Sequence, residues 1–416
     1  MNFYIKTLGC KVNQSESESC RSILTKKGWQ ETTKISCAQL IIVNSCTVTH
    51  VADRKSRNIL RRLRGQNTTA KIILTGCMPA NENSAIPKLN NLRIISKSDL
   101  EKCLLQFPDI EKKNILQLKK TRVRKFLKVQ DGCDYFCSYC VIPFVRNNHQ
   151  SLPISEIENQ LSKALSEGVK EIILTGINLG KYNYQGNDIV VLIKQLLNRE
   201  DFFRIRISSI EPNLISDELL QIIDSDKRLA PHLHIPLQGS SDRLLQLMNR
   251  KYNLEFYDNL VKKINSCNRQ INIATDLIVG FPSEEEEDVS NARSLLEKWN
   301  ILDTHFFKFS PRKGTLAFDF NNQINDEVKK NRMTSLISKM QVLKEKKLKQ
   351  YLGQKRLVLN ESINSASLNG YSGDYIKCRG ESSTSSNDPF VWVIAKDIED
   401  RNGKIGFKVE RVYNKL

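Results

Sequence analysis

The sequence predicts an α/β protein in three parts: an N-terminal open parallel-sheet domain, a central partial barrel of six β/α units, and a small C-terminal β-barrel. Strand and helix patterns alternate through the first hundred residues, and a second, longer alternation follows. After Gly353 the pattern changes to short strands with Gly, Ser and Asn turns. The expected domains are residues 1–120, 121–352 and 353–416.

In the first part, short β-branched runs at residues 3–8, 40–44 and 71–75 alternate with helical patterns that begin near residues 13 and 51. A βαβαβ unit of this kind implies parallel strands. The region from about residue 85 to 122 is less regular and ends in the basic stretch KKTRVRK, which we expect to be a linker.

The central part contains six strand patterns, at residues 125–130, 171–175, 203–208, 232–236, 271–276 and 304–309. Helical patterns lie between most of them, for example at residues 155–166, 215–225 and 285–299. Six such units suggest an incomplete eight-fold barrel with its chemistry at the loops that follow the strands. A long basic helix is expected over about residues 325–351.

The charge balance predicts a polyanionic partner. The 416 residues include 64 Lys and Arg against 46 Asp and Glu, a net charge of +18, while 40% of the residues are hydrophobic. This composition excludes a wholly disordered chain and favours contact with nucleic acid or an acidic surface. The alternative is a basic surface that serves solubility alone.

The sequence predicts a cytosolic protein without a membrane partner. It has no apolar run long enough to span a bilayer, and its first residues lack the layout of a signal peptide. In that compartment the 11 cysteines are expected to be metal ligands, catalytic thiols or packing residues rather than disulfides.

One set of three cysteines follows the strands of the first part. Cys10, Cys46 and Cys77 each come within two residues of a strand end. Because the carboxyl ends of parallel strands share one edge of a sheet, these cysteines can converge in space. The alternative is three packing thiols.

A second set lies in the loop DGCDYFCSYC, directly after the first strand of the central part. Cys133, Cys137 and Cys140 have the spacing C-x3-C-x2-C, which can wrap one cluster. A structural zinc site usually takes four ligands, and the nearest histidine is His149. Three thiolates on a four-iron cluster would leave one iron open, and zinc remains the alternative. Asp131, just before the loop, is expected to order the turn.

The cysteine loop and several other segments of the chain resemble known families. DGCDYFCSYC at the start of a six-unit partial barrel resembles the radical S-adenosylmethionine superfamily. With TLGCKVNQSESE, NSCTVTHVADRKSR and TGCMP, the chain resembles the methylthiotransferases, and TLGCKVNQ and NSCTVT look most like the enzymes that act on N6-threonylcarbamoyladenosine beside the tRNA anticodon. The resemblance continues through RIRISSIEP, PHLHIPLQ, LMNRKY, TDLIVGFP and SPRKGT.

The resemblance implies two [4Fe-4S] clusters and S-adenosylmethionine as cofactors. Cys10, Cys46 and Cys77 would hold an auxiliary cluster, and Cys133, Cys137 and Cys140 the cluster that cleaves S-adenosylmethionine reductively. The reaction would replace the C2 hydrogen of the adenine with a methylthio group. It needs an electron donor, such as a flavodoxin or ferredoxin system, and no catalytic side chain beyond the cluster ligands is implied.

S-adenosylmethionine is expected at the carboxyl ends of the central strands. The candidates by position are Gly176, Asn178, Ser209, Glu211 and Gly280. His232 and His234 share a strand face and are expected to be satisfied barrel histidines rather than metal ligands. The acidic run at residues 284–288 is expected to begin a helix, where the helix dipole favours negative charge. Packing is expected for the cysteines without ligand spacing: Cys20, Cys37, Cys103, Cys267 and Cys378.

The expected RNA contact is a basic helix that starts soon after Cys46 and faces the anticodon stem-loop of tRNA. Its basic residues are Arg54, Lys55, Arg57, Arg61, Arg62 and Arg64. A solvated basic helix is the alternative. The C-terminal part resembles the TRAM domain, an RNA-binding barrel, with candidates Tyr371, Tyr375, Lys377, Arg379 and Trp392. GESSTSSND interrupts its pattern.

The sequence departs from the family after the cysteine loop, where VRNNHQS replaces a run of Arg and Ser, and at LQGSSD and GFPSE. KVNQ after Cys10 favours the threonylcarbamoyladenosine enzymes over two rivals, the isopentenyladenosine tRNA enzymes and the ribosomal-protein aspartate enzymes. A zinc-binding RNA-interaction protein is the non-enzymatic alternative.

Overall fold

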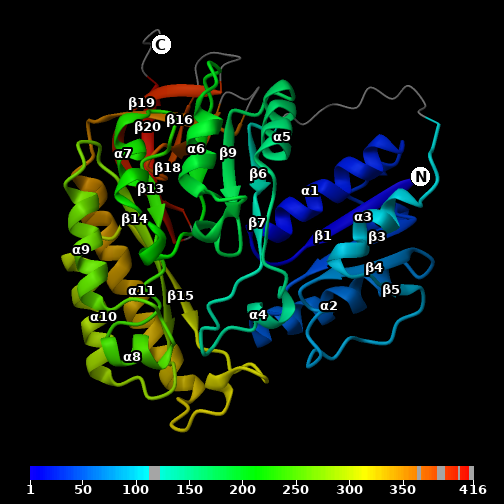
Figure 1. The fold of residues 1–416 in the computed structure, drawn as a ribbon, viewed down its shortest axis with the longest axis horizontal. Helices are drawn as coiled ribbons and strands as arrows, with labels where there is room; N and C mark the ends of the chain where they lie inside the picture. The colour runs from blue at the N-terminus through cyan, green and yellow to red at the C-terminus, as the bar shows by residue number, and fades with distance from the viewer. Residues whose placement is uncertain (112–121, 363–366, 382–388, 402, 412–416) are drawn as a thin grey trace. The chain divides into compact units, whose positions relative to one another are not determined.

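The computed structural model describes residues 1–111, 122–362, 367–381, 389–401 and 403–411 (Figure 1). They form two compact units. The first consists of Met1–Lys120, Gln130–Gln150 and Ser310–Asp319, and the second of Thr121–Val129, Ser151–Phe309 and Phe320–Leu416. The cysteine loop therefore belongs to the same compact unit as the N-terminal sheet. Across the described residues, no helix is both long and apolar enough to cross a membrane.

The first unit is an open parallel sheet with helices on both faces, as predicted. Its strands run in the order β2-β1-β3-β4-β5, all parallel. The elements are β1 (Asn2–Thr7), α1 (Lys11–Lys26), β2 (Gln30–Glu31), β3 (Leu40–Ser45), α2 (His50–Gln66), β4 (Lys71–Gly76), β5 (Leu92–Ile94), α3 (Lys97–Leu105), β7 (Gln130–Asp131) and α4 (Ile142–Val145).

Apolar side chains explain why helices cover both faces of this sheet. Leu24 of α1 and Leu104 of α3 pack with Phe3 on one face, and Leu60 and Leu63 of α2 pack on the other. The sequence reading missed β5 and α3, because both are short and α3 is held mainly by this packing. The predicted linker KKTRVRK lies partly outside the described residues, and its last two residues, Arg124 and Lys125, instead begin strand β6 (Arg124–Lys128), because Arg124 pairs with a buried carboxylate.

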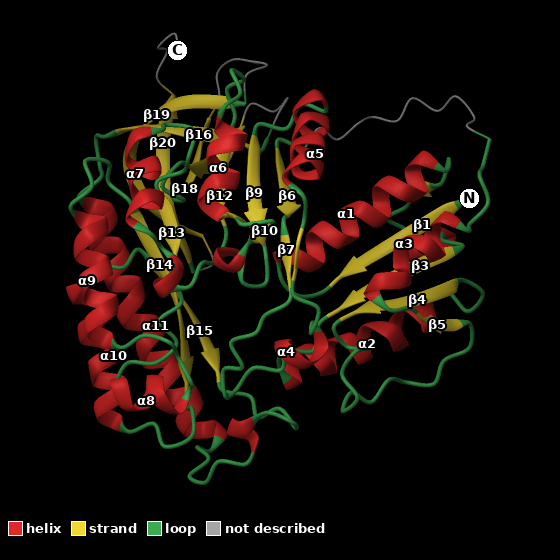
Figure 2. Ribbon diagram, viewed as in Figure 1, coloured by secondary structure: helices red, strands yellow, loops and turns green. Residues whose placement is uncertain are grey.

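The second unit contains the six predicted parallel strands in sequence order. β6, β9 and β12 form one three-stranded sheet and β13, β14 and β15 another, and the parallel bridge between Ser209 and His234 joins the two. This arrangement confirms the partial barrel. Helices α9, α10 and α11 lie along one side of β13 and β14 (Figure 2).

The elements of this part are β6 (Arg124–Lys128), β8 (Gln150–Ser151), α5 (Ile154–Ser166), β9 (Glu171–Thr175), β10 (Asn183–Tyr184), β11 (Asn187–Asp188), α6 (Ile189–Leu197), β12 (Arg204–Ile207), α7 (Asp217–Ser225), β13 (His232–His234), α8 (Asp242–Leu247), α9 (Leu254–Asn265), β14 (Asn272–Val279), α10 (Glu286–Lys298), β15 (Asp303–Lys308) and α11 (Asp326–Lys349). The acidic run begins α10 as predicted, with Glu286, Glu287 and Asp288 in its first turn.

The predicted C-terminal β-barrel is also present. Five strands close in the order β16-β17-β18-β20-β19 around a core that includes Val358, Cys378 and Phe407. The strands are β16 (Lys355–Asn360), β17 (Ser367–Ser372), β18 (Lys377–Glu381), β19 (Phe390–Arg401) and β20 (Lys404–Arg411). Most of the insertion GESSTSSND lies outside the described residues.

A buried charge cluster joins the partial barrel to this small barrel. Glu171 of β9 is fully buried and pairs with Arg124, Arg204 and Arg206. Arg204 donates to the carbonyl oxygen of Tyr371 at 3.1 Å, and Arg206 donates to that of Gly373 at 3.0 Å. One carboxylate therefore orients arginines that hold the β17 end of the small barrel.

Candidate functional site

The first set of cysteines lies at one edge of the N-terminal sheet, as predicted. β1, β3 and β4 are neighbours, and the amide of Cys77 donates to the carbonyl oxygen of Ser45 at 3.0 Å. A Cβ on Gly9, the residue before Cys10, would meet the Cβ of Cys46 at 3.0 Å. The strand ends therefore gather all three cysteines at one edge of the sheet.

Gly76 gives Cys77 its position. Its φ is +93°, and a Cβ there would meet the carbonyl oxygen of Ser45 at 2.4 Å. Only glycine adopts this conformation and tolerates this approach without strain. The sequence TGC therefore turns the chain tightly at the end of β4 and leaves Cys77 buried at the sheet edge.

The second set of cysteines lies in the same compact unit. The amide of Cys140 donates to the carbonyl oxygen of Cys137 at 2.9 Å, and Ser138 accepts a hydrogen bond from the amide of Ala317 at 2.7 Å. Gly132 precedes the loop with φ +80°, and a Cβ there would meet the carbonyl oxygen of Asn148 at 2.4 Å. The loop is therefore fixed by backbone contacts at its start and near its end.

Asp131 orders this turn as predicted, and it also binds a residue that the sequence reading passed over. Its Oδ1 accepts the amide of Gly132 at 2.9 Å and the guanidinium of Arg146 at 2.7 Å. Arg146 comes from VRNNHQS, where the departure from the family drew attention to lost charge. The one arginine that this stretch retains is buried, and its Nε donates to Sγ of Cys77 at 3.2 Å.

The donor chemistry fits two iron–sulfur clusters. Each set offers three thiols and no fourth cysteine: the remaining five, Cys20, Cys37, Cys103, Cys267 and Cys378, show no ligand spacing. Cys20, Cys103 and Cys378 are buried in apolar clusters, as expected of packing thiols. Thiolates are the ligands that iron–sulfur clusters take, and three of them leave one iron of a four-iron cluster open.

The predicted S-adenosylmethionine contacts all follow barrel strands in the second unit. Gly176 and Asn178 come after β9, Ser209 and Glu211 after β12, and Gly280 after β14. These ends lie on the carboxyl side of a parallel sheet, where such folds bind their ligands. The structure therefore places all five on the edge that the sequence predicted.

Two of these residues have partners that the sequence reading missed. Glu211 pairs with Arg250, a buried residue of the motif LMNRKY. Burial raises the pKa of the Glu211 carboxyl, and the charge of Arg250 opposes that rise. The amide of Gly280 donates to Glu284 at 2.9 Å. Glu284 itself is buried and pairs with Arg332 at 2.9 Å.

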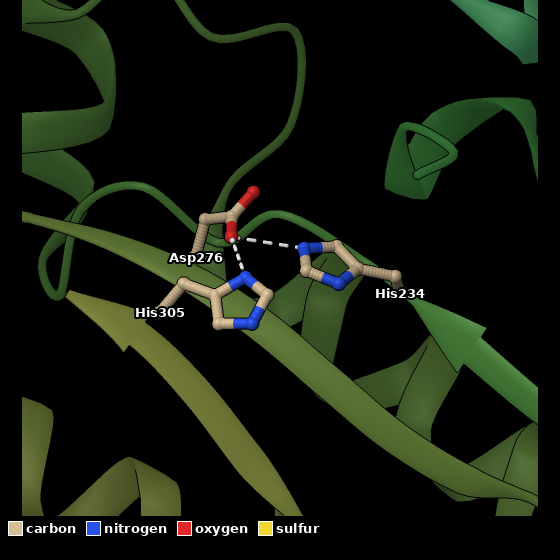
Figure 3. Close-up of side chains that lie close together, drawn as sticks. All are labelled: His234, Asp276 and His305. Atoms are coloured by element: carbon tan, nitrogen blue, oxygen red, sulfur yellow. Dashed lines mark ion pairs between the residues drawn. The ribbon is translucent and has the colours of Figure 1, made fainter. Parts of the chain in front are cut away.

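The two histidines of β13 have different surroundings. His232 packs against the ring of Tyr375, with centroids 4.8 Å apart. His234 lies 2.9 Å from Asp276, and His305 lies 3.3 Å from the same carboxylate oxygen (Figure 3). Their ligand atoms fall within 4.8 Å of one another, a grouping that could hold a metal ion. The two histidines do not form a site together, because each has its own partners.

The basic helix α2 presents most of its predicted residues to solvent. Arg54, Lys55, Arg61 and Arg62 are exposed, and Arg57 is half-buried. Arg64 differs, because its guanidinium donates to the carbonyl oxygens of Asn67, Thr68 and Ala70. It therefore caps the end of its own helix.

A cavity of about 560 Å³ opens beside α2 and concentrates positive charge. Arg57 and Arg61 line it together with Arg312 and Lys313 of the motif SPRKGT. Arg312 is buried and pairs with Asp53 at 2.7 Å. Its role was not visible in the sequence, because the segment that carries it lies about 260 positions from Asp53 and returns to the first unit only in the fold.

A second cavity, of about 690 Å³, lies between the small barrel, β15 and α11. Tyr371, Tyr375, Lys377 and Arg379 line it, as expected for RNA-binding candidates of this part. Tyr371 and Tyr375 stack with centroids 4.9 Å apart, and Arg206 lies over the Tyr375 ring. Trp392 lies on β19 and does not line this cavity.

Comparison with known proteins identifies two family models in this chain. Residues 2–95 match the uncharacterized protein family UPF0004, and residues 127–296 match the Radical SAM superfamily. Threonylcarbamoyladenosine tRNA methylthiotransferase MtaB of Thermotoga maritima is 34% identical over 90% of both chains, and that of Chlamydia pneumoniae is 33% identical over 89% of both. The tRNA-2-methylthio-N(6)-dimethylallyladenosine synthase of Endomicrobium trichonymphae is 31% identical over 87% of this chain and 89% of its own.

Solved structures with similar folds are more distant in sequence. The cobalamin-dependent S-adenosylmethionine radical enzyme OxsB, bound to aqua-cobalamin and S-adenosylmethionine, has a TM-score of 0.51 and 13% identity over 82% of this chain and 57% of its own. The radical S-adenosylmethionine methyltransferase TsrM of Kitasatospora setae has a TM-score of 0.50 and 12% identity over 74% and 72%. At these identities the likeness shows the fold alone.

Proposed function

Because this chain belongs to the radical S-adenosylmethionine tRNA methylthiotransferases, we propose that it converts N6-threonylcarbamoyladenosine, next to the tRNA anticodon, to its 2-methylthio form. Two threonylcarbamoyladenosine enzymes match about nine tenths of the chain at 33% and 34% identity, against 31% for the dimethylallyladenosine enzyme, and this difference supports the choice of nucleoside. The residues KVNQ after Cys10 support the same choice.

The family's cofactors are S-adenosylmethionine and [4Fe-4S] clusters, two of them in the methylthiotransferases. When bound, they supply the one-electron chemistry that an unactivated aromatic C–H bond requires, since no side-chain base removes that hydrogen. The protein itself binds and orients the substrate and the cofactors, and it excludes water from the site. An electron donor such as a flavodoxin or ferredoxin system would complete the reaction, and a tRNA substrate fits a cytoplasmic enzyme.

We assign the two clusters to the two sets of cysteines. Cys10, Cys46 and Cys77 would hold the auxiliary cluster, which carries the sulfur to be inserted. Cys133, Cys137 and Cys140 would hold the cluster that binds S-adenosylmethionine. The shared strand edge supports the first set, and the fixed C-x3-C-x2-C loop supports the second.

Residues at the barrel strand ends would hold S-adenosylmethionine itself. Gly176 and Gly280 would allow close backbone approach, while Asn178, Ser209 and Glu211 would offer polar groups to its amino and ribose parts. The ion pair with Arg250 supports this role for Glu211, because it keeps the carboxylate in one orientation despite its burial.

We expect Arg61→Gln to weaken tRNA binding through loss of a phosphate contact. Arg61 is exposed on α2 and lines the basic cavity. Each phosphate contact contributes about one unit to the slope of log affinity against log salt, so the slope should fall by roughly one. Filter binding of tRNA at several salt concentrations measures this slope.

Lys262→Gln, a charge loss on α9 of the second unit, is the matched control and should leave the slope unchanged. Equal slopes for all three proteins would remove α2 from the RNA contact.

The nucleoside that is modified can be identified by mass spectrometry of tRNA from cells with and without the gene. Loss of 2-methylthio-N6-threonylcarbamoyladenosine alone is the expected result. Loss of the dimethylallyl (isopentenyl) form instead would support the second candidate, which the match to the Endomicrobium trichonymphae enzyme favours. The three sequence relatives named above all carry tRNA in their names, which disfavours a ribosomal-protein substrate.

A further inference from the structure

Arg146 is a buried cation that touches a ligand of one cluster and the loop of the other. Its side chain is 1% exposed, and its Nε donates to Sγ of Cys77 at 3.2 Å. Arg146 follows Cys140 by six positions, at the end of α4. All of these residues lie in the first compact unit.

Two carboxylates fix the guanidinium so that its Nε faces the sulfur. Nη1 and Nη2 donate to the two oxygens of Glu16 at 2.9 and 3.2 Å, and Nη1 also donates to Asp131 at 2.7 and 3.0 Å. A guanidinium stays protonated in proteins, so Arg146 is a permanent cation with its fork held by two acids.

A chain of hydrogen bonds extends from this fork to another cluster cysteine. Glu16 accepts from the side chain of Asn44 at 3.3 Å, and Asn44 in turn accepts from Asn13 at 2.8 Å. The thiol of Cys10 lies 3.1 Å from Oδ1 of Asn13. Asn13 belongs to KVNQ, so that part of the sequence orients Cys10 within the network.

The other carboxylate leads to the second set of cysteines. Asp131 stands two positions before Cys133 and binds the amide of Gly132, which starts the loop. A movement of this loop therefore changes a partner of Arg146. Val141, which precedes α4, and Val145, its last residue, also pack against Cys77.

We propose that Arg146 is the positioning residue that couples the two clusters, by setting the orientation of Cys77 and the reduction potential of the auxiliary cluster according to the state of the Cys133–Cys140 loop. Hydrogen bonds to cluster sulfurs and nearby charge are the protein's means of setting such potentials. The proposal rests on the proposed function, since it requires a cluster on Cys77.

The sign of the effect follows from charge. A cation with an N–H bond to a ligand sulfur stabilises the reduced, more negative cluster, so its removal makes the potential more negative. Removing the charge of Glu16 leaves the positive charge of Arg146 less neutralised, so the reduction potential becomes more positive. Opposite shifts from the two substitutions are a signature that mere loss of packing would not produce.

The test uses the full chain with Cys133, Cys137 and Cys140 all changed to alanine, reconstituted anaerobically with iron and sulfide. The auxiliary cluster is then the only one left, and a reductive titration followed by electron paramagnetic resonance gives its potential. Arg146→Gln should titrate at a more negative potential and bind iron about 10–100-fold less tightly. Glu16→Gln should titrate at a more positive potential.

Two further variants complete the design. Arg146→Lys keeps the charge without the fork, so the potential should lie between those of the parent protein and Arg146→Gln. Arg21→Gln removes an arginine that pairs with Glu18 and Glu31, so its potential should match that of the parent.

A parental potential in both Arg146→Gln and Glu16→Gln, or shifts in the same direction, would overturn the proposal. If Arg146→Gln holds no cluster, Arg146→Lys and Glu16→Gln decide by the same criterion. A parent protein that binds no cluster would instead contradict the cluster assignment.

Discussion

Cys133→Ser should form no 5′-deoxyadenosine from S-adenosylmethionine, whereas Cys77→Ser should keep part of this cleavage and yet yield no methylthiolated tRNA. Under the proposed assignment the two cysteines hold different clusters, so each substitution would remove one cluster and spare the other. Cleavage would then depend on the cluster that binds S-adenosylmethionine, and insertion of sulfur on the auxiliary cluster. Chromatography of the small products and mass spectrometry of the tRNA, both after reduction with dithionite, measure the two steps separately.

Iron content provides an independent readout of the same prediction. Each variant should retain about half of the iron of the reconstituted parent, because one of two four-iron clusters is lost. Cys267→Ser is the control, since this partly exposed cysteine in the second unit shows no ligand spacing and should keep both activities. Methylthiolated tRNA from both Cys133→Ser and Cys77→Ser would contradict the assignment, as would a parent chain that takes up zinc but no iron.

Glu171→Gln should lower the free energy of unfolding of the second unit by about 3–5 kcal/mol, which is typical when one partner of a buried ionic cluster is removed. The carboxylate is fully buried, and its loss leaves Arg124, Arg204 and Arg206 without their common counter-charge. Denaturant unfolding followed by circular dichroism measures the change. Because Arg204 and Arg206 also hold β17, the small barrel should loosen first, with a lower affinity for tRNA.

The control and the pH dependence separate this effect from a general loss of stability. Glu167→Gln removes a carboxylate that is 43% exposed and pairs with Lys125 at 3.4 Å, so it should cost less than about 1 kcal/mol.

The stabilisation should also depend on pH. Burial raises the pKa of Glu171, but the charges of Arg204, Arg206 and Arg124 hold this pKa far below its ordinary value of 4.5. The stabilisation is therefore complete above pH 4.5 and declines as the pH falls toward the folded-state pKa. A constant difference between parent and variant down to pH 2 would contradict the ion-pair origin.

Local sequence patterns were enough to predict the architecture. The β-branched runs, the change to short strands after Gly353 and the cysteines that follow successive strands each depend on a few adjacent residues. Parallel strands then bring their carboxyl ends together without further information. Short or weakly patterned elements such as β5 and α3 were missed because packing, rather than local preference, stabilises them.

The sequence predicted the roles of individual charged residues less well than it predicted the architecture. The sequence indicated that Arg64 was an RNA contact, but in the fold its guanidinium caps the end of α2. Glu284 belongs to the acidic run that the sequence assigned to a helix start, and in the fold Arg332 and the amide of Gly280 bind it in the interior. Arg332 lies 48 positions from Glu284, so no local pattern indicated this ion pair.

The sequence by itself predicted the fold class and the two sets of three cysteines from local patterns and spacing, and the family from the resemblance of its motifs. Only the tertiary structure placed the loop of Cys133, Cys137 and Cys140 in the same compact unit as the N-terminal sheet, with Arg146 on Cys77. The reason is physical. A buried guanidinium is stable only where hydrogen-bond acceptors surround it, and the partners of Arg146 come from separate segments that only the folded chain brings together.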